Sequence, residues 1–152
     1  WKVSLNPGKG SYVFGQKNDS RAILMKPLTG MNKSGNAVKE FCINQRLLLS
    51  NVHVIVDDID LPLGKLRIRP KGGDGCHRGM ESIIYQNRDN NFPRIRFGIA
   101  VGSKLRPSEQ YVLKDFKKSD QNLADEMIVR AADAAELIFE DGLNKAMNKY
   151  NA

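Results

Sequence analysis

Residues 52–79 decide how this chain is expected to fold, and they read Val-His-Val-Ile-Val-Asp-Asp-Ile-Asp-Leu-Pro-Leu-Gly-Lys-Leu-Arg-Ile-Arg-Pro-Lys-Gly-Gly-Asp-Gly-Cys-His-Arg-Gly. The first residues are β-branched and apolar on both sides of the pleat, which is typical of a strand covered on both faces. Carboxylates follow at Asp57, Asp58 and Asp60, which we expect at the C-terminal end of that strand, where open α/β sheets bind ligands. This order predicts an α/β fold with the strand from Val52 inside the sheet.

Basic residues and glycines fill the second half of the stretch. Lys65, Arg67 and Arg69 recur at a spacing of two, so they share one face of the next strand. The glycines within residues 71–79 leave backbone amides open to an approaching anion. These features favour a polyanionic ligand, and the simpler alternative is a solvated strand face followed by an ordinary loop.

The rest of the chain completes an α/β order. Helical patterns are expected at residues 34–47, 76–86, 119–140 and 143–150, and further strands at 9–15, 22–26 and 94–101. A polar turn is expected at residues 17–20 and a basic loop at 104–108. The strand at 22–26, the following helix and the strand from Val52 should form a parallel βαβ unit. We therefore expect a three-layer α/β/α sandwich with a mixed, mostly parallel central sheet, in a single domain over residues 1–152.

Composition narrows the class of partner. The 152 residues carry 24 Lys and Arg against 17 Asp and Glu, a formal net charge of +7, which favours a polyanionic partner, the alternative being a basic protein with no nucleic-acid role. Two cysteines are too few for a disulfide framework and fit a reducing compartment. No apolar run approaches ~20 residues, so no transmembrane helix is expected. No metal is predicted, because only Cys76 lies near a histidine, and no nucleotide or other cofactor, because the glycine loop lacks the Lys-Ser/Thr of a Walker motif.

Several motifs in one order carry a resemblance. They are Leu-Met-Lys-Pro-Leu-Thr-Gly-Met-Asn-Lys-Ser-Gly at 24–35, Asp-Asp-Ile-Asp-Leu-Pro-Leu-Gly at 57–64, Lys-Gly-Gly-Asp-Gly-Cys-His-Arg-Gly at 71–79, Phe-Pro-Arg-Ile-Arg-Phe-Gly-Ile at 92–99 and Tyr-Val-Leu at 111–113. Together they resemble bacterial-type peptidyl-tRNA hydrolases. The resemblance implies cleavage of the ester between peptide and tRNA, which needs a base that activates water, an acidic partner that orients the base, and amides that hold the substrate.

The resemblance also implies roles for individual residues. Asp57 would orient a catalytic histidine, and Asn32 would be one of the asparagines that bind the substrate. Arg69 and Arg96 fall at positions similar to the family's tRNA phosphate-binding residues, and arginine can grip phosphate bidentately. The expected substrate- or RNA-binding residues are Arg69, Arg96, His77, Arg78 and Lys71.

Departures from the family's motifs gather at the expected site. The catalytic histidine of the family precedes the strand that residues 9–15 resemble, and no histidine precedes residue 53 here. The family's first strand, loop and helix are thus expected to be missing. A loop histidine is replaced by Asp74 and a loop asparagine by Arg78. These departures predict a divergent member that binds tRNA or another structured RNA with impaired catalysis, within a ribonucleoprotein or organellar assembly.

Two alternatives stay open. One is an active hydrolase that carries the catalytic base outside these 152 residues, and the other is a structural subunit that uses the fold only for packing. The ribosome or another large assembly is a further candidate partner. The expected compartment is a plastid, a mitochondrion or the bacterial cytoplasm.

A missing first strand would leave a slot beside the strand from Val52. Unpaired backbone groups in such a slot cost about 1–3 kcal/mol each if buried. The expected fillers are a segment outside this sequence, a strand of a partner chain, or Trp1–Leu5 folded back.

Overall fold

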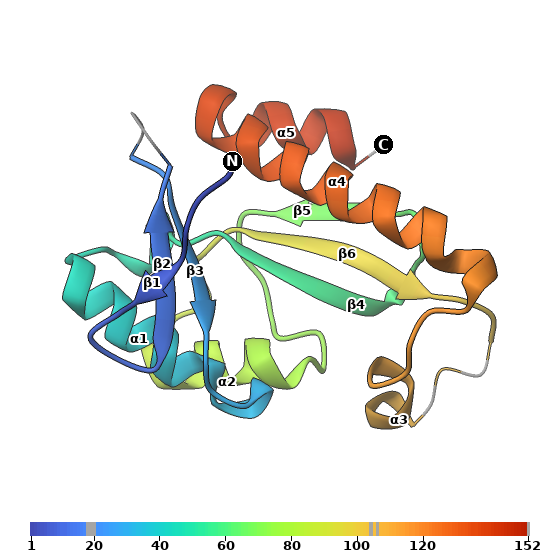
Figure 1. The fold of residues 1–152 in the computed structure, drawn as a ribbon, viewed down its shortest axis with the longest axis horizontal. Helices are drawn as coiled ribbons and strands as arrows, with labels where there is room; N and C mark the ends of the chain where they lie inside the picture. The colour runs from blue at the N-terminus through green and yellow to red at the C-terminus, as the bar shows by residue number, and fades with distance from the viewer. Residues whose placement is uncertain (18–20, 104, 106, 152) are drawn as a thin grey trace. The chain divides into compact units, whose positions relative to one another are not determined.

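The structure, a computed structural model, describes residues 1–17, 21–103, 105 and 107–151. The chain divides into two compact units, one built from residues 1–52 and 71–92 and the other from 53–70 and 93–152. Each unit contains its own three-stranded sheet (Figure 1). The expected turn at 17–20 and the expected loop at 104–108 fall partly outside the described residues. No helix among the described residues is both long and apolar enough to cross a membrane.

The first unit contains sheet A, which is antiparallel throughout with strand order β1-β2-β3. Aromatic packing joins this sheet to a helix, since the rings of Tyr12 and Phe41 meet edge-to-face with centroids 5.3 Å apart. The elements of the unit are β1 (Asn6–Pro7), β2 (Tyr12–Gln16), β3 (Ile23–Pro27), the 3₁₀ turns η1 (Met31–Lys33) and η2 (Leu49–Asn51), and the helices α1 (Ser34–Gln45) and α2 (Arg78–Asn87).

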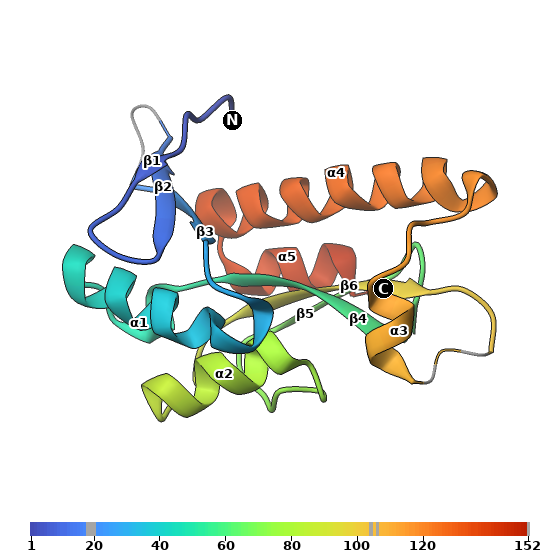
Figure 2. The ribbon, with the colours of Figure 1, turned by 60° about the horizontal axis from the view of Figure 1, so that its bottom comes forward.

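Helices α1 and α2 lie side by side at a glycine (Figure 2). The backbone N–H of Gly35 donates to Oγ of Ser82 at 3.0 Å, and both residues are buried. A Cβ atom at position 35 would overlap the backbone carbonyl group of Ser82. The two helices therefore approach this closely only because Gly35 has no side chain.

The second unit contains sheet B, in which β4 runs parallel to β6 and β5 runs antiparallel to β6. Helices α4 and α5 lie along one face of this sheet in both views (Figures 1 and 2). The elements of the unit are β4 (Val54–Pro62), β5 (Leu66–Arg69), β6 (Arg94–Ala100), α3 (Ser108–Val112), α4 (Lys118–Asp141) and α5 (Leu143–Tyr150).

The core of this unit forms where the apolar face of sheet B meets α4 and α5. Helix α4 places small and apolar residues at helical spacing against the sheet, whereas Leu123 near its start is 42% exposed. The buried members are Leu66, Ile68, Ile95, Met127, Ala131, Ala134, Ile138, Ala146 and Tyr150.

The α/β class is confirmed, and sheet B is mixed as expected. The interior position expected for the strand from Val52 is wrong, because β4 pairs with β6 along one edge and no described residue pairs with its other edge. Residues 1–5 belong to no strand, so the Trp1–Leu5 stretch does not fill that slot. The expected parallel βαβ unit is also wrong. Strand β3 instead forms an antiparallel pair with β2 in sheet A.

The three aspartates lie within a strand rather than beyond its end. Strand β4 continues through Asp57, Asp58 and Asp60 to Pro62, with a register shift between Asp58 and Pro62. Continued pairing with β6 keeps this stretch extended, although aspartate is unfavourable in strands. The chain turns at Pro62 and Gly64, where the N–H of Lys65 donates to the Pro62 carbonyl and Gly64 adopts φ 93°.

Candidate functional site

Four arginines share one face of sheet B, opposite the apolar core, and we call this set the arginine face. In the antiparallel register Arg67 lies opposite Arg96, and Arg69 lies opposite Arg94. Since side chains alternate along a strand, the arginines point away from the helices that cover the other face. Like charges placed directly opposite each other are unfavourable, so this arrangement calls for compensating groups.

Two members of the arginine face, Arg94 and Arg96, are buried or paired within the protein. Nη2 of Arg96 lies 2.7 Å from Oδ2 of Asp58, and the Asp58 side chain is only 4% exposed. Arg94 is 2% exposed, and burial together with the charge of Arg96 lowers the pKa of its guanidinium. Arg96, expected to grip phosphate, therefore neutralises a buried carboxylate in this structure. Its pairing depends on the register of β4 against β6, which the sequence alone does not show.

The other two members, Arg67 and Arg69, are exposed. Neither guanidinium makes a hydrogen bond or ion pair within the described part of the chain. An exposed arginine without a protein partner keeps all its donors for an anion. Arg69 was expected at this kind of site from the sequence, and Arg67 joins it through the two-residue spacing.

Asp57 and Asp58 point to opposite faces of sheet B. Asp57 is partly buried and pairs in register with Phe97, whereas Asp58 shares a face with Arg96. Neighbouring carboxylates in one strand thus have different surroundings. Asp58 forms an ion pair with Arg96 and belongs to the structural framework, whereas the role expected for Asp57 stays a prediction.

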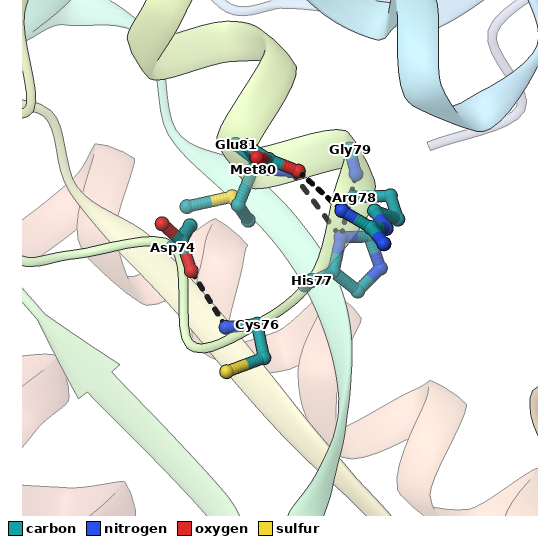
Figure 3. Close-up of polar contacts among 7 residues, drawn as sticks. All are labelled: Asp74, Cys76, His77, Arg78, Gly79, Met80 and Glu81. Carbon is teal, nitrogen blue, oxygen red and sulfur yellow. Dashed lines mark hydrogen bonds and ion pairs between the residues drawn. The ribbon is translucent and has the colours of Figure 1, made fainter. Parts of the chain in front are cut away.

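The glycine loop at residues 71–79 belongs to the first unit, and its polar groups largely bind one another (Figure 3). Oδ1 of Asp74 accepts the backbone N–H of Cys76 at 2.6 Å. Cys76 adopts φ 58°, a left-handed conformation, so this bond helps to hold an unfavourable turn. The expected replacement at position 74 therefore has a local structural role.

The next two residues of the loop start helix α2. Nδ1 of His77 accepts the backbone N–H groups of Gly79 at 3.1 Å and Met80 at 3.3 Å, so the imidazole caps the helix (Figure 3). Arg78 is exposed and pairs with Glu81 one turn later at 3.1 Å. Such exposed pairs are weak, so Arg78 remains able to exchange Glu81 for another anion. Lys71, at the start of the loop, is exposed.

Asn32 lies in the 3₁₀ turn η1 and is exposed. This turn contacts the start of α2, where a Cβ at Gly79 would overlap the Met31 sulfur and the His77 ring. The first unit thus brings the Asn32 turn beside His77. Asp57, Arg69 and Arg96 belong to the second unit.

The remaining histidine has a packing role. The ring of His53 meets Phe139 of α4 with centroids 5.4 Å apart. Across the described residues, no group of three or more His, Cys, Asp or Glu side chains is arranged to hold a metal ion.

Comparisons with known proteins agree with one another. A family model described as peptidyl-tRNA hydrolase matches residues 1–152. The peptidyl-tRNA hydrolase of Thermoanaerobacter sp. (strain X514) is 44% identical over 154 residues, which cover 99% of this chain and 83% of that protein. That of Clostridium botulinum (strain Okra / Type B1) is 40% identical, covering 94% of this chain and 75% of that protein. The crystal structure of peptidyl-tRNA hydrolase from Acinetobacter baumannii matches with a TM-score of 0.86 at 30% identity, over 99% of this chain and 78% of that one.

These matches correct the expected loss of function. The prediction of a catalytically impaired RNA-binding protein in a ribonucleoprotein or organellar assembly is wrong, because relatives at 40–44% identity over nearly the whole chain are bacterial peptidyl-tRNA hydrolases. Two of the departures that prompted it, at Asp74 and Arg78, have local explanations. Asp74 holds the turn at Cys76 and Arg78 pairs with Glu81, so neither replacement reports that the chemistry has been lost.

Proposed function

This chain belongs to the peptidyl-tRNA hydrolase family, and we propose that it is an active enzyme that cleaves the ester linking a peptide to tRNA and so recycles the tRNA. The observation that carries the proposal is the 44% identity to a bacterial peptidyl-tRNA hydrolase over 99% of the chain. The family model spans both compact units, which supports one functional domain over residues 1–152.

The proposed chemistry is attack of water on the ester carbonyl, assisted by a histidine base. We assign Asp57 as the carboxylate that orients this base, and the Asn32 amide as a group that binds the substrate. We assign the base itself to neither histidine of these residues, because His53 packs on Phe139 and His77 caps α2.

The proposed tRNA contacts are basic groups, in keeping with the net charge of +7. Arg69 and Lys71 are exposed and would bind phosphate directly. Arg78 would do so by leaving Glu81. Arg96 and His77 would act mainly by holding their neighbours in place, Arg96 through Asp58 and His77 through the start of α2.

Peptide release from an N-acylaminoacyl-tRNA tests the reaction. We expect Asp57→Asn and Asn32→Ala each to lower kcat/KM by about a hundredfold, since each removes a group that acts on the base or the substrate. Asp125→Asn and Asn36→Ala are matched controls, because both residues are exposed on helices, and neither should alter the rate. A natural protein that binds tRNA without releasing peptide would refute the proposed function.

The proposed cellular compartment is inferred from the organisms of the relatives. They are bacterial, which supports a bacterial cytoplasm rather than an organelle. Both cysteines are free thiols, in keeping with a reducing compartment. A contact with the ribosome stays a prediction from the sequence.

A further inference from the structure

Strand β5 carries Arg67 and Arg69, which have no partner among the described residues, and it lies at an edge of sheet B. It has only four residues, Leu66–Arg69, and pairs with β6 on one side. Ile68 stands between Arg67 and Arg69, and its side chain is completely buried in the core. The position of Ile68 therefore sets the direction of both arginines, which leave the strand on the opposite face.

The outer edge of β5 is bound by the side chain of Asn151. Its Oδ1 accepts the backbone N–H of Ile68 at 2.6 Å, and its Nδ2 donates to the Ile68 carbonyl at 3.0 Å. In an antiparallel ladder every second residue turns both backbone groups away from its partner strand, and these two bonds identify Ile68 as such a residue. The Asn151 amide thus supplies the donor and the acceptor that a further strand would have offered.

Asn151 is itself fixed by the residues before it. It follows α5 directly, and its backbone N–H donates to the Met147 carbonyl at 3.0 Å. Ala146 and Tyr150 of the same helix are buried in the core that contains Ile68. The side chain that binds β5 therefore starts from a rigid support.

We propose that Asn151 is a positioning residue for tRNA binding, which clamps Ile68 and thereby aims Arg67 and Arg69 at substrate phosphate. This inference rests on the proposed function, because the arginines are useful only if a polyanion binds. A short edge strand held by four residues of ladder would otherwise shift and fray easily. On β5 these hydrogen bonds involve only the backbone of Ile68, so they occupy none of the guanidinium donors of Arg67 and Arg69.

A double-mutant cycle tests the clamp in the complete natural protein. We expect Asn151→Leu to raise KM for peptidyl-tRNA by roughly three- to tenfold with kcat within about twofold, as expected when two hydrogen bonds that support binding are lost. In an Arg67→Ala/Arg69→Ala background the same change should have little further effect, because the groups that the clamp aims are gone. Asn148→Leu, an exposed asparagine three residues earlier, is the matched control.

Hydrogen exchange at the Ile68 amide provides a second measurement, independent of catalysis. Its exchange should accelerate in Asn151→Leu and stay unchanged in Asn148→Leu. If the leucine variant does not fold, Asn151→Asp keeps an acceptor for the Ile68 N–H while losing the donor to the carbonyl, and Asn148→Asp controls for the added charge. Additive KM effects in the double mutant, or unchanged exchange at Ile68, would overturn the proposal.

The two proposals fail in different ways. If the natural protein releases no peptide, the proposed function is refuted, and the same cycle is then measured with equilibrium binding of uncharged tRNA. If peptide release is normal but Asn151→Leu and Asn148→Leu behave alike, only the clamp is refuted.

Discussion

The glycine loop and the arginine face both looked like RNA-binding surfaces in the sequence, and they differ in what their polar groups do. In the loop, Asp74 holds a backbone N–H, His77 caps α2 and Arg78 pairs with Glu81. On the arginine face, Arg67 and Arg69 have no partner in the described part of the chain. The difference shows that residue type suggests which ligand a surface could bind. Whether a side chain is available to bind that ligand depends on the contacts it makes within the folded protein.

The largest effect is expected on stability, from replacing Arg96, the member of the arginine face that forms an ion pair with Asp58. Arg96→Met should lower the free energy of unfolding by about 3 kcal/mol, because it leaves the buried Asp58 carboxylate without its cation. Urea denaturation measures this loss. Asp58→Asn added to Arg96→Met should recover part of it, and Arg67→Ala should change stability by less than about 0.5 kcal/mol. Equal stability of Arg96→Met and wild type would show that the ion pair does not hold the face together.

A smaller effect separates the two surfaces in tRNA binding. Arg69→Ala should weaken tRNA affinity by about tenfold and lower the slope of log K against log salt by about one, since it removes one phosphate contact. Arg78→Ala should do less, because its guanidinium gives up Glu81 before it can bind phosphate. Titrations at several salt concentrations measure both variants. A larger loss for Arg78→Ala would reverse the comparison and make the loop the main contact.

The smallest effect concerns the cap in the loop. His77→Ala should cost about 1 kcal/mol of unfolding free energy, because the N–H groups of Gly79 and Met80 lose their acceptor. His77→Asn should retain most of the stability, since asparagine is a good N-cap. Thermal and urea unfolding measure both. If His77→Asn is stable but binds tRNA much more weakly than wild type, the imidazole also contacts the RNA.

Local patterns predicted the four longer helices, whereas the short helix α3 and the contacts between distant segments escaped prediction. The spacing of Met127, Ala131, Ala134 and Ile138 gave the buried side of α4, because a helix repeats its environment every turn. The length of β4 was underestimated, since pairing with β6 overrides the poor strand propensity of aspartate. The edge position of β4 was missed because the order of strands in a sheet depends on which strands pair. The hydrophobicity of a single strand does not identify its partners.

The candidate site shows the same contrast between residues found from local motifs and contacts that depend on the fold. Asp57, Arg69 and Asn32 were found from motifs, and their roles stay predictions. The ion pair of Arg96 with Asp58 needed the register of two strands. The turn at Asp74 had a readable signal, because Asp before Gly favours a side-chain bond to the backbone two residues on.

The contact at Gly35 has a genetic consequence. A single nucleotide change converts a glycine codon into an alanine codon, and at this position the added methyl group would force α1 away from Ser82 of α2. The added Cβ would meet the backbone of Ser82 and Ile83 first, inside the first unit. Such an allele would weaken folding more on warming than it alters the reaction. Gly35→Ala is therefore a rational starting point for a temperature-sensitive strain, in which the proposed function predicts that peptidyl-tRNA accumulates on warming.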